Sequence, residues 1–105
     1  MSEATFMAPA DIDADFTLRC DDDSMVNARL FKGDIVFAKT CEDVEDGQIA
    51  VILIDQDYCL KRVYHGSDYL ELRAENPKYP PMFVRGTHEN VKIIGKVVKA
   101  WCNVN

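Results

Sequence analysis

Residues 48–73 read QIAVILIDQDYCLKRVYHGSDYLELR, and this stretch decides the fold class. Its first part, Ile49–Ile54, is a continuous apolar run of strand length, which is typical of a buried central strand. After a polar turn, Tyr58–Tyr64 predicts the next strand, and a glycine-containing hairpin loop joins it to a third at Tyr69–Arg73. The stretch therefore predicts three consecutive strands, the first of them in the middle of a sheet.

Strand signals continue on both sides of this stretch. Upstream, short runs at Phe16–Cys20 and Asp34–Lys39 have the length and composition of strands. Downstream, Met82–Val84 predicts a short strand, and Val91–Trp101 predicts a long last strand that bends at Gly95. Because these signals lie close together and no long window has a helical period, the predicted class is mostly β.

The remaining segments are turns and loops. Met25–Leu30 is the only window that fits a helical turn. Residues 75–81 contain three prolines and predict an irregular loop, because proline lacks the N–H that a strand ladder needs. Residues 1–15 have no clear period, so we expect a linker or tail. The length of 105 residues then favours a single domain over residues 16–105.

The composition restricts the partners that this chain can bind. Its formal net charge of −6 has the wrong sign for neutralising phosphates, so we expect DNA to be bound only through another domain. No run approaches the roughly 18 apolar residues of a membrane span, and no basic region precedes the first apolar residues as in a signal peptide. We therefore expect a cytoplasmic protein, with no membrane contact, whose cysteines are reduced and mostly buried: Cys20, Cys41, Cys59 and Cys102.

The sequence predicts no metal site and no cofactor. The spaced acids of residues 11–15 resemble the start of a calcium loop, but Phe16 stands where that loop needs glycine and Asp22 where it needs glutamate. His65 and His88 are the only histidines, and neither has a cysteine or a second histidine at ligand spacing for zinc. We expect the acids to form a solvated linker and His65 to be a turn residue.

Ser24 and Lys61 are the candidate catalytic residues. Ser24 follows three acidic residues, 21–23, just past a predicted strand, and Lys61 lies inside another strand further along the chain. A serine nucleophile paired with a lysine base is a known variant of the hydrolase triad. The alternative is that Ser24 is a turn serine and that Lys61 is a charge guarding an edge strand.

The alternation of side chains along its strand bears on whether Lys61 can act as a base. A lysine accepts a proton only when it is neutral, and burial favours the neutral form. Lys61 shares its face with Cys59 and Val63, which are readily buried, whereas Arg62 faces away and is expected to be the solvated charge. The three acids before Ser24 oppose this effect, because carboxylates favour the charged lysine. We therefore expect chemistry that is slow at neutral pH and faster at higher pH.

Five short motifs follow one another along the chain: Asp22-Asp23-Ser24-Met25, Lys32-Gly33-Asp34-Ile35-Val36, Asp46-Gly47-Gln48-Ile49-Ala50-Val51, Leu60-Lys61-Arg62-Val63, and Glu75-Asn76-Pro77 followed by Tyr79. In their order and intervals they resemble the catalytic C-terminal domain of the LexA-like repressors. That group includes LexA, the phage CI-type repressors and the UmuD-type mutagenesis proteins. The resemblance covers about residues 16–101, nearly the whole chain.

The resemblance implies a mostly β fold of coiled sheets that is shared with signal peptidases. It implies Ser24 as the nucleophile and Lys61 as the general base, with the backbone N–H groups of Asp23 and Ser24 around the oxyanion. The implied reaction cleaves a peptide bond in the protein's own linker and separates a DNA-binding domain from this domain. In the family, a filament of RecA on single-stranded DNA provokes that cleavage during the SOS response.

This chain departs from the family pattern at two places. Asp22 stands where many relatives have glycine, and aspartate is among the few other residues that tolerate a positive φ, so we expect a strained turn there. The chain also lacks a helix-turn-helix and the Ala-Gly or Cys-Gly dipeptide at which relatives cut themselves. We therefore expect a fragment of a longer repressor, without its own scissile bond.

The resemblance also implies a homodimer. Alternation puts Ile93, Val97 and Trp101 on one face of the last strand, and aromatic residues are enriched at interfaces. We expect the dimer contact near Val98–Trp101. Two other functions fit the same motifs: a dimerisation module of a phage-type repressor that does not cleave itself, and a UmuD-type polymerase accessory protein.

Overall fold

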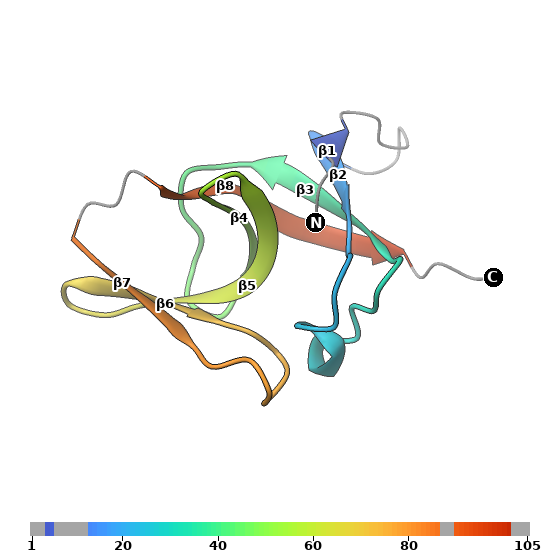
Figure 1. Ribbon diagram of the computed structural model, residues 1–105. Helices are drawn as coiled ribbons and strands as arrows, with labels where there is room; N and C mark the ends of the chain where they lie inside the picture. Colours follow the sequence, from blue (N-terminus) through green and yellow to red (C-terminus); the bar gives the residue numbers. More distant parts are fainter. Residues whose placement is uncertain (1–3, 6–12, 87–89, 102–105) are drawn as a thin grey trace.

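The computed structural model describes residues 4–5, 13–86 and 90–101, which form one curled β-sheet (Figure 1). The described residues make eight antiparallel strands and one short 3-10 helix. These elements are β1 (Ala4–Thr5), β2 (Phe16–Arg19), η1 (Val26–Ala28), β3 (Ile35–Thr40), β4 (Ile49–Ile54), β5 (Asp57–His65), β6 (Tyr69–Arg73), β7 (Met82–Arg85) and β8 (Val91–Trp101). The prediction of a mostly β domain is confirmed, and the helical turn lies within the window predicted for it.

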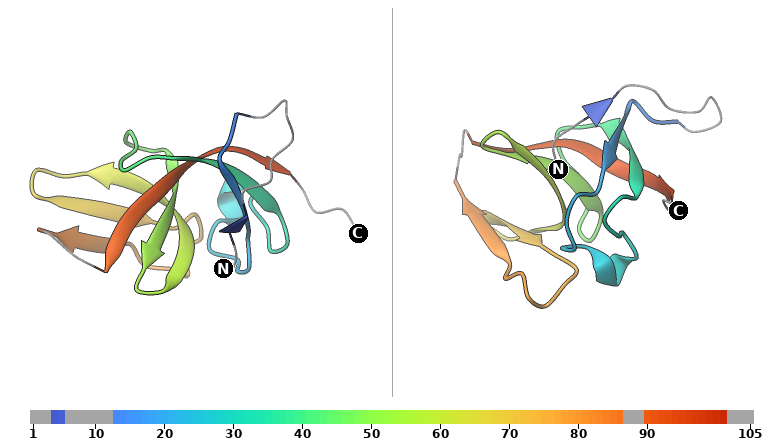
Figure 2. Two further views of the ribbon diagram at one scale, coloured as in Figure 1. Left: turned by 90° about the horizontal axis from the view of Figure 1, so that it is seen from above. Right: turned by 45° about the vertical axis from the view of Figure 1, so that its right-hand side comes forward.

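The strand order explains how distant parts of the chain meet. Along the sheet it runs β1-β2-β3-β8-β4-β5-β6-β7. The last strand of the chain, β8, therefore lies in the middle and joins the β1–β3 half to the β4–β7 half (Figure 2). β4 pairs with β8 on one side and β5 on the other, which confirms the central strand predicted from its apolar run.

β8 is irregular at two points. Its register against β4 shifts between Gly95 and Ile93, and its register against β3 shifts between Lys99 and Val97. A Cβ on Gly95 would lie 2.7 Å from the ring of Phe16, so only glycine lets that ring pack directly on the strand. The sequence predicted a bend at Gly95, and the register shift against β4 lies at this position. The strict alternation is wrong, because the shifts put Val97 in a different cluster of side chains from Ile93.

The core is divided between the two faces of β4 and β5. Val51 and Leu60 belong to one cluster of buried side chains, which also includes Met25, next to Ser24. Ile52 and Val63 belong to a second cluster on the other face. Cys59, Lys61 and Val63 alternate along β5, so Lys61 lies on the face of the second cluster, to which Cys59 and Val63 belong.

Part of the predicted linker or tail contacts the sheet. β1 pairs with β2, and the Asp15 N–H donates a hydrogen bond of 2.8 Å to the Ala38 carbonyl. The Asp15 carboxylate accepts a hydrogen bond of 2.7 Å from the Thr40 N–H. These contacts extend the β2–β3 pair toward the N-terminus. Asp11, the first acid of the calcium-like pattern, lies outside the described residues.

Three cysteines lie in the described part of the chain, and all are free thiols. Cys20 is buried, and Cys41 and Cys59 are half-buried. Cys102 and His88 lie outside the described residues. Among the described residues, no helix is long and apolar enough to cross a membrane.

Candidate active site

Ser24 lies in a short loop between β2 and η1, which we call the nucleophile loop (residues 21–25). Hydrogen bonds of 2.8 Å hold its start: the Cys20 N–H donates to the Asp34 carbonyl, and the Gly33 N–H donates to the Cys20 carbonyl. Gly33 has a φ of 97°, which glycine adopts without strain. At the other end, Met25 is buried in the core, and Ser24 itself is only 3% exposed.

The Asp22 carboxylate makes the principal contacts of Ser24. One oxygen, Oδ1, accepts a hydrogen bond of 2.8 Å from the Ser24 hydroxyl and another of 3.0 Å from the Ser24 N–H. The expected strained turn is wrong: among the described residues other than glycine, only Arg29 and Asp55 have a positive φ. Asp22 acts through its side chain, which caps the turn in the manner of an Asx-turn.

These contacts bear on the expected oxyanion donors, the N–H groups of Asp23 and Ser24. The Ser24 N–H is occupied by the Asp22 carboxylate rather than directed at open space. A carboxylate is a strong acceptor, so this N–H is available to an oxyanion only after Asp22 moves away.

The proline-rich loop of residues 75–81 clamps the nucleophile loop through Asp23. The Tyr79 hydroxyl donates to Asp23 Oδ1 at 2.5 Å, and Lys78 Nζ lies 2.6 Å from Asp23 Oδ2. The Asn76 side-chain amide donates to the Asp23 carbonyl at 2.8 Å. The hydrogen bond from Lys78, followed by that from Tyr79, lowers the pKa of the Asp23 carboxyl.

Two further contacts fix the same loop. The Glu75 N–H donates to the Ser24 carbonyl at 2.8 Å, and the Asn27 N–H donates to the Glu75 carbonyl at 2.8 Å. The residues joined by the bonds from Asn76 and Tyr79 to Asp23 are more than fifty positions apart in the sequence. The nucleophile loop is therefore held in place by a segment that comes much later in the chain.

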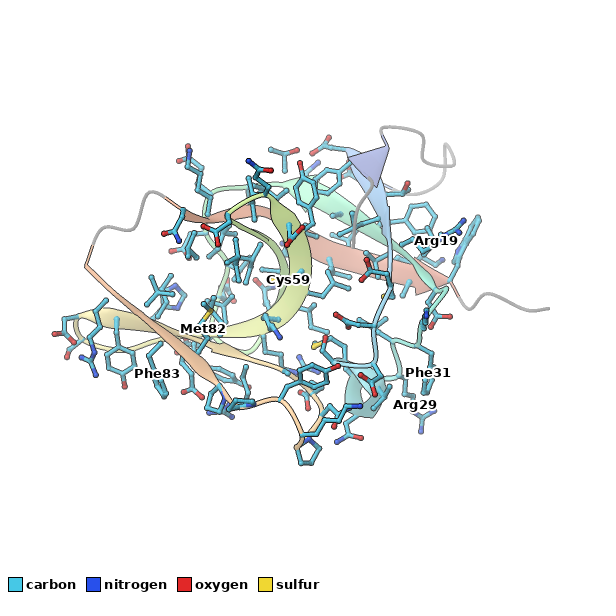
Figure 3. All side chains as sticks on the ribbon, in the orientation of Figure 1. Arg19, Arg29, Phe31, Cys59, Met82 and Phe83 are labelled. Carbon is cyan, nitrogen blue, oxygen red and sulfur yellow. The ribbon has the colours of Figure 1, made fainter. Side chains whose placement is uncertain are left out.

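Lys61 reaches this cluster from β5. It is half-buried, and its ammonium lies 5.6 Å from the centre of the Tyr79 ring, which is a cation–π distance. Its neighbour on the same strand face is Cys59, labelled in Figure 3. Burial raises the pKa of the Cys59 thiol to about 11; the charge of Lys61 acts in the opposite direction, and Asp22 adds to the increase. Cys59 thus lies within electrostatic reach of both Lys61 and the carboxylate that binds Ser24.

Comparison with known proteins shows the family to which this chain is similar. Residues 2–98 match the Peptidase S24-like family. The chain belongs to the Peptidase S24-like family. Relatives include LexA repressor 2 of Geobacter sulfurreducens, 41% identical over 79% of this chain and 41% of the repressor. The LexA repressor of Caldicellulosiruptor saccharolyticus is 40% identical over 79% of this chain and 39% of its own length. This S24 chain thus spans about two-fifths of these relatives, as those shares show.

Two side chains of this S24 domain differ from their sequence-based predictions. Arg62, expected to be a solvated charge, is half-buried: its Nε binds Glu75, and its Nη1 donates to the Gly47 carbonyl at 2.6 Å. His65 ends β5 and contacts Asp46 and Asp43 at 2.5 and 2.9 Å. Both residues join segments that are distant in sequence, and nothing in their local pattern indicated these partners.

The described residues contain no group of three or more His, Cys, Asp or Glu side chains placed to hold a metal ion. The acids nearest Ser24 are instead engaged by protein groups. Asp22 binds Ser24, and Asp23 binds Lys78 and Tyr79. Ser24 supplies a buried hydroxyl and Lys61 a half-buried amine, which are side chains used as nucleophile and base in acyl transfer.

Proposed function

We propose that this chain is the self-cleaving and dimerising C-terminal domain of a LexA- or CI-like transcriptional repressor. Ser24 acts as the nucleophile and Lys61 as the general base. The observation that carries the proposal is the position of Tyr79, whose hydroxyl binds Asp23 beside Ser24 while its ring contacts the Lys61 ammonium. Membership of the S24 family and the similarity to LexA repressors support the same assignment.

In the proposed reaction, neutral Lys61 takes the proton of the Ser24 hydroxyl while Oγ bonds to the carbonyl carbon of the scissile peptide. The carbonyl electrons move to oxygen, and the N–H groups of Asp23 and Ser24 stabilise the oxyanion, each by about 2.7–4 kcal/mol. The C–N bond then breaks, and the Lys61 ammonium gives its proton to the leaving amine. Water hydrolyses the acyl-serine, with Lys61 again as the base.

The resting contacts of Asp22 make this a slow enzyme. The hydroxyl proton and the N–H of Ser24 are both directed at the Asp22 carboxylate. For attack, the hydroxyl proton must point toward Lys61 instead, and the N–H must be free to bind the oxyanion. A partner that displaces Asp22 would therefore start the reaction, and a RecA filament on single-stranded DNA is the partner that the LexA-like assignment implies.

The same assignment gives the rest of the protein its role. DNA is bound by a helix-turn-helix domain outside this chain, because the net charge of −6 disfavours DNA binding here. Cleavage separates that domain from the dimer and relieves repression in the cytoplasm.

The proposed homodimer contact lies at the end of β8. Val98 is 42% exposed and Trp101 is 47% exposed, although the Trp101 ring also contacts Phe37 edge-on at 4.9 Å. Large exposed apolar side chains of this kind are typical of interfaces. We expect sedimentation to show a dimer at high micromolar concentration and Trp101→Ala to weaken it. A wild-type chain that remains a monomer would contradict this part of the proposal.

The peptidase is tested with the full-length protein at alkaline pH, where lysine loses its proton. We expect the wild type to cut itself, and Ser24→Ala and Lys61→Ala to remain intact while still forming dimers. Persistence of the wild type under these conditions would favour the alternative of a dimerisation module without cleavage. The upstream sequence distinguishes the third function, because a short tail in place of a helix-turn-helix indicates a UmuD-type accessory protein.

A further inference from the structure

A cleft with two chemically different ends opens beside Lys61. Its volume is about 470 Å³, and it lies between the β4–β5 hairpin and the segment that leads into β7. Figure 3 labels one residue from each wall, Cys59 on β5 and Met82 on β7. The residues that line the cleft are Ile54, Asp55, Asp57, Cys59, Lys61, Pro80, Pro81 and Met82.

The cleft is cationic at one end and anionic at the other. Asp57, Cys59 and Lys61 alternate along β5 and share one face. Four residues at about 3.3 Å each put Asp57 roughly 13 Å from Lys61. Asp55 lies in the turn beside Asp57, where its Oδ1 accepts a hydrogen bond of 3.0 Å from Asn90.

The walls between these ends are apolar. Ile54, Pro80, Pro81 and Met82 contribute hydrocarbon surface, and Met82 is 40% exposed. Apolar walls with a few charged groups at defined positions are the usual composition of a ligand site. An extended peptide advances about 3.3 Å per residue, so the distance between the two ends corresponds to about four peptide residues.

We propose that this cleft binds the substrate peptide and selects one with an apolar side chain near the scissile bond and a lysine or arginine about four residues away. The basic side chain lies against Asp55 and Asp57, and the apolar one against Pro80, Pro81 and Met82. This inference rests on the proposed function, because it takes Lys61 to mark the reacting end. The net charge of −6 adds to the preference for a basic over an acidic peptide.

Binding of synthetic peptides to the Ser24→Ala chain tests the inference without cleavage. The probes are dye-labelled ten-residue peptides of alanine and serine with a central Ala-Gly bond, in which a single lysine or glutamate is placed at each position in turn. By fluorescence anisotropy, we expect lysine four residues from the Ala-Gly bond to bind about tenfold more tightly than glutamate there. The difference should shrink as salt is added.

Two variants show whether the carboxylates cause the preference. Asp55→Asn with Asp57→Asn removes both charges, and asparagine tolerates the φ of 55° at position 55. This double variant should bind lysine and glutamate peptides equally. Asp68→Asn, which removes a charge from the β5–β6 loop outside the cleft, should keep the tenfold preference. Equal binding by the parent chain, or a preference that survives in the double variant, would overturn the inference.

The fate of the inference can be separated from that of the peptidase. If the full-length protein fails to cut itself but the chain keeps the charge-dependent preference, the peptide site stands and the peptidase fails. If the full-length protein cuts itself and no preference is seen, the peptidase stands and the peptide site is overturned.

Discussion

Replacing Asp22 with glycine should accelerate the proposed self-cleavage, because it frees the two groups of Ser24 that the proposed reaction uses. The hydroxyl and the N–H of Ser24 both donate to Asp22, at 2.8 and 3.0 Å. A hydrogen bond to a charged group contributes about 1.5–3 kcal/mol. Because Asp22 is exposed to water, the lower value applies, and about 1.5 kcal/mol removed from the barrier corresponds to roughly a tenfold faster reaction.

The assay is the first-order rate of self-cleavage of the full-length protein, measured on gels across a series of alkaline pH values. Asp22→Gly should also move the pH–rate curve to lower pH, because one carboxylate that favours a protonated amine in the site is gone. Asp22→Asn is the matched variant: it keeps an acceptor of the same shape without the charge. Its rate should therefore lie between those of the wild type and Asp22→Gly.

A slower Asp22→Gly protein would refute this reasoning. It would mean that the carboxylate holds the Ser24 hydroxyl in the productive rotamer rather than away from Lys61. A faster protein with an unchanged pH–rate curve would keep the hydrogen-bond argument and remove the electrostatic one.

Tyr79→Phe keeps the ring by Lys61 but loses the hydrogen bond to Asp23, so the proposed self-cleavage should slow several-fold. Tyr64→Phe is the control: the Tyr64 ring lies by Arg73, and the rate should be unchanged. Gly95→Ala should lower the free energy of unfolding in urea by about 1–3 kcal/mol, because its Cβ would overlap the Phe16 ring; adding Phe16→Leu should recover part of that loss. Hydrogen bonds with Asp46 and then Asp43 raise the pKa of His65. The stabilisation of the fold by protonated His65 is therefore complete below about pH 6.5, the ordinary pKa of histidine. It is lost as the pH rises through the higher pKa of His65 in the folded protein. His65→Gln should flatten the pH dependence of the thermal midpoint in that window, and an unchanged profile would contradict the argument.

Local patterns in the sequence predicted most of the strands. The apolar run Ile49–Ile54 gives the bounds of β4, and the glycine-containing turn at residues 66–68 separates β5 and β6. The side-chain faces of β8 could not be derived in this way. Alternation assumes an even ladder, and the register shifts near Gly95 and Val97 depend on how β3 and β4 pair with β8.

The sequence predicted which residues form the candidate site, but not the hydrogen bonds and ion pairs that they make. Ser24 and Lys61 stood out in the sequence, and their catalytic roles stay a proposal. The sequence did not predict the hydrogen bonds of Asp22 or the pairing of Arg62 with Glu75. A charged residue that binds a distant partner looks the same in a sequence as one that faces water. The prolines of residues 75–81 indicated an irregular loop, but its partner Asp23 is set by tertiary packing.

The position of β8 in the sheet makes the joining of its two halves depend on a strand that is made late. The nucleophile loop belongs to the half of the sheet formed by β1–β3, and Lys61 belongs to the half formed by β4–β7. Among the described strands, only β8, which is made after all the others, pairs with both halves. A nascent chain that ends before β8 lacks the strand that joins the half carrying Ser24 to the half carrying Lys61, and long-range pairing of this kind forms late. We therefore expect the proposed self-cleavage to begin only after β8 has been made.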